Sequence, residues 1–302
     1  MTGGAPPPRG AIQSEERVLL VDPKQRRYLV ALRQHGAFHT HAGIVAHDDI
    51  IGRPEGSTVT GSTGRRFVVL RPTLADVVLK MPRGAQVIYP KDLGAILMAA
   101  DIGPGMRVLE AGVGSGALSM ALLRAGAEVV GYEVRDDFAL RAEANVAAWV
   151  GEPAAYRVER RDVYDGIDEA GLDRIVLDLP EPARVIAPAE RALRPGGILL
   201  AYLPTINQTA ELRAALSRSA FGLAETSEVL RRTWHVEARS VRPDHRMVAH
   251  TGFLTTARLL VPAAGASDGS EAGASDGSAR TGLDHGDHLD VLGHGEQVEG
   301  TQ

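Results

Sequence analysis

The 302-residue sequence contains no cysteine. This absence excludes disulfide bridges, thiolate metal sites and a cysteine nucleophile, and it suits a cytoplasmic protein. No apolar run approaches the ~20 residues that a membrane-spanning helix needs, so we expect no membrane partner. The first ten residues hold three prolines and one arginine but no apolar stretch, which argues against a secretory signal.

The acidic net charge of −5 arises at one end of the chain. Residues 264–302 contain eight acidic residues and one arginine, a charge of −7, which leaves +2 for the remainder. A body so close to neutral is compatible with RNA binding but does not demand it. The 264–302 segment is polar, repetitive and free of aromatic residues, which predicts a disordered acidic tail. Its histidines (His285, His288 and His294) fit a solvated tail better than a metal site.

The rest of the chain divides into two regions with different patterns of predicted secondary structure. After a flexible leader at 1–13, residues 14–75 are expected to form a small β domain, because short strand-like runs alternate with Gly and Pro turns. The expected strands are 18–21, 28–32, 50–51, 57–60 and 66–70. Such a domain serves packing or oligomerisation at least as readily as binding.

Helix and strand signals alternate over residues 76–263, which implies βαβ units and a parallel sheet. The expected strands are 108–111, 129–133, 156–159, 175–179 and 198–203, and the expected helices are 93–101, 115–125, 136–150, 183–193 and 207–219. Two β-rich runs follow, 227–241 and 251–261, joined by a turn at 242–245. The fold class is therefore α/β, a mostly parallel sheet that ends in an antiparallel hairpin.

A glycine turn follows the first strand of this second region. The run Val108-Leu-Glu-Ala-Gly-Val-Gly-Ser-Gly116 predicts a strand, a turn and a helix start, which places backbone N–H groups and a helix N-terminus against a ligand. Glu133, at the end of the next strand, would accept hydrogen bonds from the two hydroxyls of a ribose. The motif therefore predicts a nucleoside cofactor.

The glycine spacing leaves two cofactors open. Gly112, Gly114 and Gly116 form G-x-G-x-G, and Ala117 lets the turn satisfy the dinucleotide pattern as well. Glu110 favours S-adenosylmethionine (SAM), because a carboxylate at this point would repel a pyrophosphate and attract the ammonium group of SAM. The C-terminal antiparallel hairpin, which resembles the usual ending of class I methyltransferase sheets, also favours SAM.

Carboxylates recur at the ends of four successive strands, namely Glu110, Glu133, Asp162 and Asp178. Helix capping would explain one or two of them, but four beside a glycine turn indicate a site. Asp162 would accept from the amino group of an adenine, and the neighbouring Arg161 would lie on the rim of the site or at the surface. Asp178 begins an Asp-Leu-Pro-Glu-Pro loop, stiffened by its prolines, at the place where a methyl acceptor must enter.

Together these motifs resemble the bacterial tRNA (adenine-58-N1)-methyltransferases. The matching segments are 38–43, 56–61, 86–92, 108–116, 162–166, 177–182, 202–208 and 246–254. The Tyr-Pro-Lys-Asp run at 89–92 and the Asp-Leu-Pro-Glu-Pro loop are fairly specific to this family. The resemblance implies a class I methyltransferase fold, SAM as methyl donor without a metal, tRNA as substrate and a homotetramer whose small N-terminal domain aids tRNA binding.

The resemblance also implies a role for individual residues. Asp178 would hydrogen-bond the target adenine and position its N1, while Tyr89 and Tyr202 would stack on or border the flipped base. Lys91 would contact phosphates, together with Arg231, Arg232, Arg242 and Arg246. The residues expected at the cofactor are Glu110, Gly112, Val113, Gly114, Ser115, Gly116, Glu133, Arg161, Asp162 and Asp178.

One position departs from the family pattern. Ala183 follows the second proline of the loop, where the family usually has Trp, so the loop could be looser or the acceptor pocket larger. The departure motivates one alternative, a SAM-binding but non-catalytic RNA-binding subunit. A second alternative is another class I methyltransferase, such as a protein carboxyl methyltransferase, and a nicotinamide oxidoreductase comes last.

Overall fold

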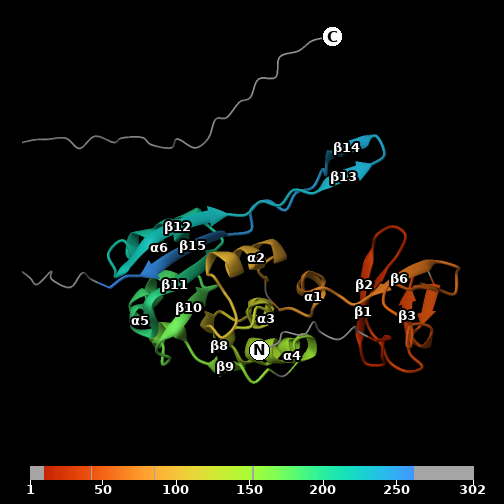
Figure 1. The fold of residues 1–302 in the computed structure, drawn as a ribbon, viewed down its shortest axis with the longest axis horizontal. Helices are drawn as coiled ribbons and strands as arrows, with labels where there is room; N and C mark the ends of the chain where they lie inside the picture. Colours follow the sequence, from red (N-terminus) through yellow and green to blue (C-terminus); the bar gives the residue numbers. More distant parts are fainter. Residues whose placement is uncertain (1–9, 42, 85, 152, 262–302) are drawn as a thin grey trace, which may run out of the picture. The chain divides into compact units, whose positions relative to one another are not determined.

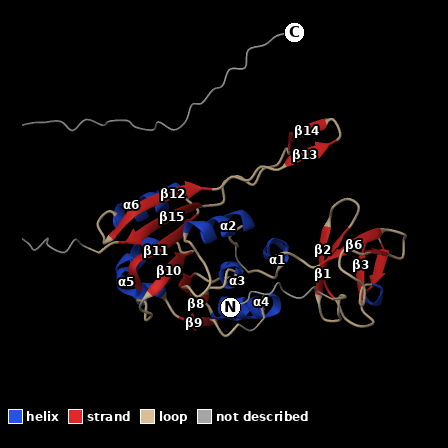
Figure 2. Cartoon of the chain, viewed as in Figure 1, coloured by secondary structure: helices blue, strands red, loops and turns tan. Residues whose placement is uncertain are grey.

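The structure is a computed structural model that describes residues 10–41, 43–84, 86–151 and 153–261. Most of the expected leader and the whole of the expected acidic tail lie outside these residues. Figures 1 and 2 show two β-containing regions along the described chain. Among the described residues, no helix has the length and apolar character to cross a membrane.

The first region is a four-stranded antiparallel sheet in the order β2-β1-β6-β5. Its strands are β1 (Arg17–Val21), β2 (Arg27–Ala31), β5 (Thr58–Thr60) and β6 (Arg66–Leu70). A further hairpin, β3 (Ala37–Thr40) with β4 (Gly43–Ala46), was not predicted. The predicted strand at 50–51 is wrong, because Ile50 follows the 3₁₀ turn η1 (His47–Asp49) and is fully buried as a core anchor.

The second region is a seven-stranded sheet in the order β12-β15-β11-β10-β7-β8-β9. Its strands are β7 (Arg107–Ala111), β8 (Glu128–Glu133), β9 (Tyr156–Arg160), β10 (Leu172–Leu177), β11 (Leu193–Leu203), β12 (Phe221–Glu228) and β15 (Phe253–Leu259). Strands β7 to β11 pair in parallel, and β15 pairs antiparallel with both β11 and β12. The predicted α/β class, with a mostly parallel sheet and an antiparallel end, is confirmed.

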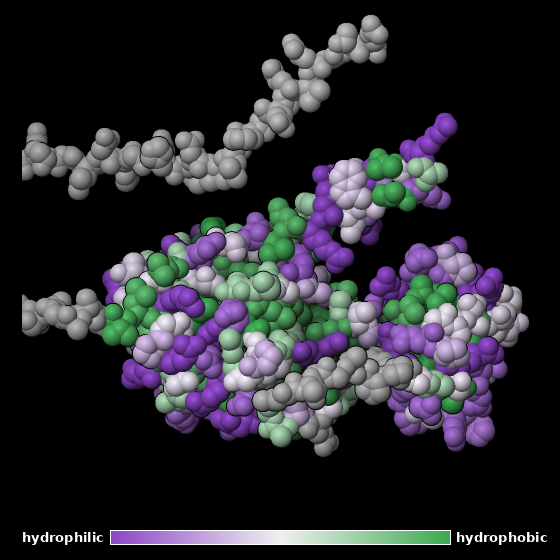
Figure 3. All heavy atoms as spheres, viewed as in Figure 1, coloured by the Kyte–Doolittle hydropathy of each residue, from purple (hydrophilic) through white to green (hydrophobic). Residues whose placement is uncertain are grey.

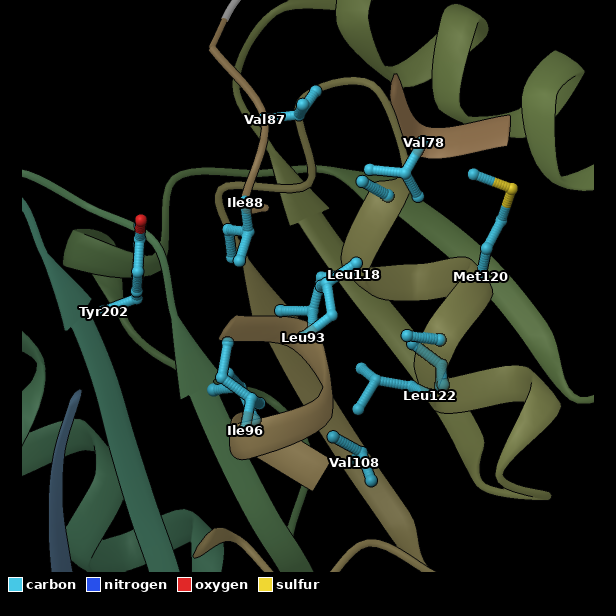
Figure 4. Packing of buried hydrophobic residues seen from close by; sticks show 14 of the residues in the cluster. Val78, Val87, Ile88, Leu93, Ile96, Val108, Leu118, Met120, Leu122 and Tyr202 are labelled. Carbon is cyan, nitrogen blue, oxygen red and sulfur yellow. The ribbon is translucent and has the colours of Figure 1, made fainter. Parts of the chain in front are cut away.

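Helices cover both faces of this sheet. They are α1 (Leu74–Lys80), α2 (Pro90–Ala99), α3 (Ala117–Arg124), α4 (Asp136–Trp149), α5 (Ile186–Ala192) and α6 (Ile206–Leu216). Neighbouring strand residues point to opposite faces, and so Val108 packs with α2 and α3 while Leu109 packs with α5 and α6. Figure 4 shows the first of these clusters, with Leu93 and Ile96 of α2 facing Leu118 and Leu122 of α3.

Two predicted boundaries fail for local reasons. The expected helix at 183–193 is a 3₁₀ turn, η3 (Pro182–Val185), followed by the short helix α5. A continuous helix would need a backbone N–H at Pro188, which proline lacks. Helix α2 begins at Pro90 rather than 93, since proline is well suited to the first helical position.

The C-terminal hairpin is formed by other residues than those predicted. Strand β12 starts earlier than the expected 227, and residues 229–252 form an excursion with its own hairpin, β13 (Trp234–Glu237) and β14 (Ser240–Pro243). The turn therefore lies at 238–239 rather than 242–245. The excursion exposes large apolar side chains, including Trp234 and Val236. Figure 3 shows green apolar patches beside polar purple atoms on this hairpin.

Candidate active site

The glycine turn after β7 is shaped by its neighbours. Gly112, Gly114 and Gly116 have φ values of 86°, 56° and 79°, a region that favours glycine. A Cβ added at Gly112 would lie 2.2 Å from the carbonyl oxygen of Asp178, whereas one at Gly114 would meet nothing within 4 Å. The turn is thus packed against the end of β10 at one residue and open at the next.

Glu110 places a buried carboxyl group near this turn. Its Oε2 accepts a hydrogen bond of 2.6 Å from the Ser119 hydroxyl, and burial raises its pKa to about 8. Among the described residues, the other carboxylate oxygen of Glu110 and the hydroxyl of Ser115 have no hydrogen-bond partner. Unpartnered buried polar atoms are costly, so the pair indicates that a polar ligand completes this part of the molecule.

Glu133 is held by backbone donors at the end of β8. The N–H of Gly114 donates to its Oε2 at 3.0 Å, and the N–H of Arg135 donates to its Oε1 at 3.0 Å. The side chain is nearly buried, at 7% exposure. Each carboxylate oxygen keeps a further lone pair, so Glu133 can accept two additional hydrogen bonds from a ligand.

Asp162 and Arg161 follow β9 and line a cavity at the end of that strand. The carboxylate of Asp162 accepts from the N–H of Tyr164 at 2.9 Å and caps the turn η2 (Val163–Asp165). The guanidinium of Arg161 pairs with Asp168 and lies 5.5 Å from the centre of the Tyr132 ring. Both residues line a cavity of about 670 Å³, where the charge of Arg161 is paired with Asp168.

Asp178 lies directly after β10, where its N–H donates to the carbonyl of Ala111 at 3.0 Å. The carboxyl group is half-buried, and this burial raises its pKa to about 7. At neutral pH the group is therefore poised between its neutral and charged forms.

A cavity of about 420 Å³ opens beside Asp178. Its lining comes from four parts of the chain: Gln86, Val87, Ile88 and Tyr89 before α2, Asp178 after β10, Tyr202 and Pro204 at the end of β11, and His250 and Thr251 before β15. Two tyrosines and one carboxyl group thus share a single opening. The structure brings Asp178, Tyr89 and Tyr202 to one cavity, and their roles toward an adenine stay predictions.

Lys91 lies elsewhere than expected. Its side chain is only 4% exposed, and its ammonium group donates to Asp92 at 2.7 Å, to the Val229 carbonyl at 2.6 Å and to the Thr251 hydroxyl at 2.6 Å. All three ammonium hydrogens are thereby used. The prediction that Lys91 contacts phosphate is wrong for this geometry. Lys91 instead holds Thr251, which lines the cavity.

The Asp-Leu-Pro-Glu-Pro loop is held by Tyr164. Its hydroxyl accepts from the N–H of Glu181 at 3.2 Å, and its ring lies 4.1 Å from the guanidinium carbon of Arg184. Gln208 adds a hydrogen bond of 3.0 Å to the Pro180 carbonyl. These contacts order the loop although position 183 is alanine.

His250, Thr251 and Gly252 were missed as individual residues. They lie within the 246–254 segment that carried the family resemblance, but nothing in their local pattern indicates that they reach the cavity. A Cβ added at Gly252 would lie 2.5 Å from the Tyr202 ring. Glycine at this position therefore lets the ring pack directly on the backbone.

Comparison with known proteins identifies the family. A family model described as TrmI-like N-terminal matches residues 10–59, and one described as the tRNA methyltransferase complex GCD14 subunit matches residues 66–245. The tRNA (adenine(58)-N(1))-methyltransferase TrmI of Thermus thermophilus is 40% identical over 245 residues, which cover 80% of this chain and 96% of that protein. The chain belongs to the TrmI family of tRNA methyltransferases.

Other relatives agree with this membership. The TrmI protein of Methanocaldococcus jannaschii, named for methylation of adenines 57 and 58, is 34% identical over 80% of this chain and 94% of that protein. The solved TrmI of Aquifex aeolicus has a TM-score of 0.76 at 29% identity, covering 83% of this chain and 100% of that chain. A Thermotoga maritima structure titled as a SAM-dependent O-methyltransferase has a TM-score of 0.80 at 33% identity, covering 83% of this chain and 95% of that chain. The predicted family, class I fold and methyl donor are confirmed.

Proposed function

We propose that this chain transfers the methyl group of SAM to N1 of an adenine in tRNA, at position 58 of the T-loop. The observation that carries the proposal is the cavity in which Asp178, Tyr89 and Tyr202 meet beside the glycine turn. Family membership supports the same reaction, since the TrmI relatives are named for it.

The residues present fit SAM. The unpartnered oxygen of Glu110 and the hydroxyl of Ser115 can hold an ammonium or carboxylate group, and Glu133 can accept from ribose hydroxyls. Asp162 and the rim residue Arg161 would border the adenine ring, with Gly112, Val113, Gly114 and Gly116 supplying the turn. When bound, SAM supplies a methyl group on a positively charged sulfur. In the described part of the chain, no cluster of three or more His, Cys, Asp or Glu side chains is placed to hold a metal ion.

Asp178 would act on the acceptor adenine. N1 carries a lone pair in the plane of the base, so no proton must be removed before it attacks. The chain must instead align N1 with the methyl carbon at near-attack distance. The methylated ring is cationic, and the Asp178 carboxylate would stabilise that developing charge. This role requires the ionised form, which the raised pKa of about 7 makes available from neutral pH upward.

The aromatic walls would receive the flipped base. An adenine in a folded T-loop must be unstacked before it can reach a methyl donor, at a cost of a few kcal/mol. Tyr89 and Tyr202 line the cavity and would stack on or border the extruded ring. The exposed arginines of the 229–252 excursion, Arg231, Arg232, Arg242 and Arg246, would contact phosphates.

We also propose a homotetramer that works in the cytoplasm. The excursion exposes Leu230, Trp234, Val236 and Val241 at 57%, 58%, 70% and 61%. Apolar patches of this kind mark association surfaces, and a second copy of the chain is the partner that the family resemblance implies. A tRNA substrate supports the cytoplasmic location.

Methyl transfer from labelled SAM to unmodified tRNA tests the reaction, with the modified nucleoside identified by mass spectrometry. We expect 1-methyladenosine in the T-loop. Asp178→Ala should leave SAM binding largely intact, measured by calorimetry, and cut transfer severely. SAM binding without any transfer would favour the non-catalytic subunit, and methyl transfer to a protein carboxyl group would favour the other methyltransferase.

A further inference from the structure

His250 joins two strand ends beside the acceptor cavity. Its Nδ1 lies 2.7 Å from a carboxylate oxygen of Glu228, and its Nε2 lies 2.8 Å from the carbonyl oxygen of Pro204. Glu228 is the last residue of β12, and Pro204 directly follows β11. The imidazole therefore connects two strands that do not pair with each other.

Both partners of the ring are hydrogen-bond acceptors. A backbone carbonyl cannot donate, and neither can an ionised carboxylate. A neutral imidazole has one N–H, so it can satisfy only one of these partners, whereas the imidazolium has two. The geometry therefore favours the doubly protonated ring, whose side chain is 46% exposed, and the same contacts with Pro204 and Glu228 raise the pKa of His250 above its ordinary 6.5.

The bridge spans the start of β15. Phe253, the first residue of that strand, pairs with Leu203 of β11 on one side and with Glu228 of β12 on the other, and the three strands run side by side in Figure 1. The ring of His250 packs on the ring of Phe253, with 4.8 Å between their centres. The histidine therefore closes the sheet edge at the point where these three strands meet.

The same sheet edge forms one wall of the acceptor cavity. His250 and Pro204 both line the cavity, as does Tyr202, two residues before Pro204. The backbone at Gly252 lies against the Tyr202 ring, so the 250–252 segment sets the position of that ring. A shift of the Pro204 carbonyl away from His250 would move the aromatic wall.

We propose that His250 is a positioning residue whose protonated ring holds the Tyr202 wall of the acceptor cavity in the shape that admits adenine. The proposal rests on the proposed methyl transfer to tRNA. Transfer would then depend on two ionisations of opposite sense. It rises as Asp178 loses its proton, and it falls as His250 loses one.

Charged groups act on the imidazole from two other elements. Glu228 approaches it from β12, and the charge of Lys91 on α2 opposes its protonation. Asp178 lines the same cavity from the end of β10. The Glu228 carboxylate is therefore the group whose removal should change the titration of His250 most.

Glu228→Gln provides a sharp test. A glutamine amide can accept from the imidazolium or donate to the neutral ring, so the bridge survives in either protonation state. The assay is kcat and KM for tRNA and for SAM between about pH 6 and pH 9. The wild-type protein should lose activity at the alkaline end by about fivefold, the worth of one hydrogen bond, and the Glu228→Gln variant should not.

Two further variants complete the test. His250→Gln should lower kcat about fivefold across the whole range, with KM for SAM unchanged and no alkaline decline. Glu190→Gln is the matched control, because Glu190 accepts from the N–H of Ala220 at the opposite end of β12 and its amide keeps that contact. This control should reproduce the wild-type profile.

The proposal would be overturned by an alkaline decline that persists in Glu228→Gln, or by wild-type kcat in a folded His250→Gln. An NMR titration gives a readout that does not need activity. The His250 resonance, identified by its absence in His250→Gln, should titrate above 6.5 in the wild-type protein and lower in Glu228→Gln. If the wild-type protein transfers no methyl group to tRNA, the proposed function fails, and this titration still decides whether His250 is the bridging cation.

Discussion

Gly112 links the cofactor turn to the loop that carries Asp178, and Gly112→Ala tests that link. The added Cβ would lie 2.2 Å from the Asp178 carbonyl oxygen and 3.2 Å from a methyl carbon of Leu179. Normal contact requires the two backbones to separate by about 1 Å. The φ of 86° adds about 1–2 kcal/mol, because a side chain in the left-handed region meets its own carbonyl.

The expected stability loss has two parts. Strain at φ contributes about 1–2 kcal/mol, and the forced backbone separation contributes about 1–3 kcal/mol, as overpacking of a tight interior does. Gly105→Ala is the matched control, since Gly105 has a φ of 75° and a Cβ there meets nothing within 4 Å. Urea unfolding of both variants should therefore show the larger loss in Gly112→Ala.

Gly112→Ala should lower the rate of methyl transfer by a larger factor than the Gly105→Ala control does. Displacement of Asp178 by about 1 Å misaligns the acceptor, and such displacements cost on the order of 100-fold in rate. Single-turnover transfer with saturating SAM isolates this effect from cofactor binding. Equal stability losses in the two variants, or an unchanged transfer rate in Gly112→Ala, would refute the close approach of the turn to Asp178.

Three further predictions concern other residues. Burial raises the pKa of Glu110 from 4.5 to about 8, so the folded protein loses stability as pH rises through that range. Glu110→Gln should therefore make the free energy of unfolding depend less on pH, as measured by urea unfolding near pH 5 and pH 8. If the variant loses as much stability between pH 5 and pH 8 as the wild-type protein does, the raised pKa of Glu110 is contradicted. Lys91→Met should leave the salt dependence of tRNA binding unchanged because the ammonium is buried, whereas Arg232→Ala should lower the slope by about one; filter binding at several salt concentrations decides. Tyr164→Phe removes the acceptor of the Glu181 N–H and should lower kcat by about twofold to fivefold, while retention of full kcat would show that the ring stack alone holds the loop.

Features that are local in the sequence were predictable. The strand, glycine turn and helix of residues 107–124 are contiguous, and the carboxyl groups of Glu110, Glu133 and Asp178 each lie within one residue of a strand end. Parallel strands bring their carboxyl ends to one edge, so the composition of that edge followed from the chain order. The cofactor side of the site therefore needed no knowledge of distant contacts.

Features that depend on distant pairs were not predictable. The partners of the Lys91 ammonium include Val229 and Thr251, which lie 138 and 160 residues away, so its burial has no local signal. His250 reaches Pro204 across 46 residues. Strand β12 is also hidden in the sequence, because half of its residues are exposed and it lies at the edge of the sheet.

The position of β15 has a consequence for synthesis of the chain. It is the last strand that the structure describes, yet it lies between β11 and β12. At about 5–20 residues per second, several seconds separate the emergence of Leu203 from that of its partner Phe253. During this interval β11 presents an open edge, a template for pairing with another chain. The nascent protein can therefore form its glycine turn well before the 250–252 segment completes the wall of the acceptor cavity. A chain whose synthesis stops before Phe253 would contain the turn but lack that wall.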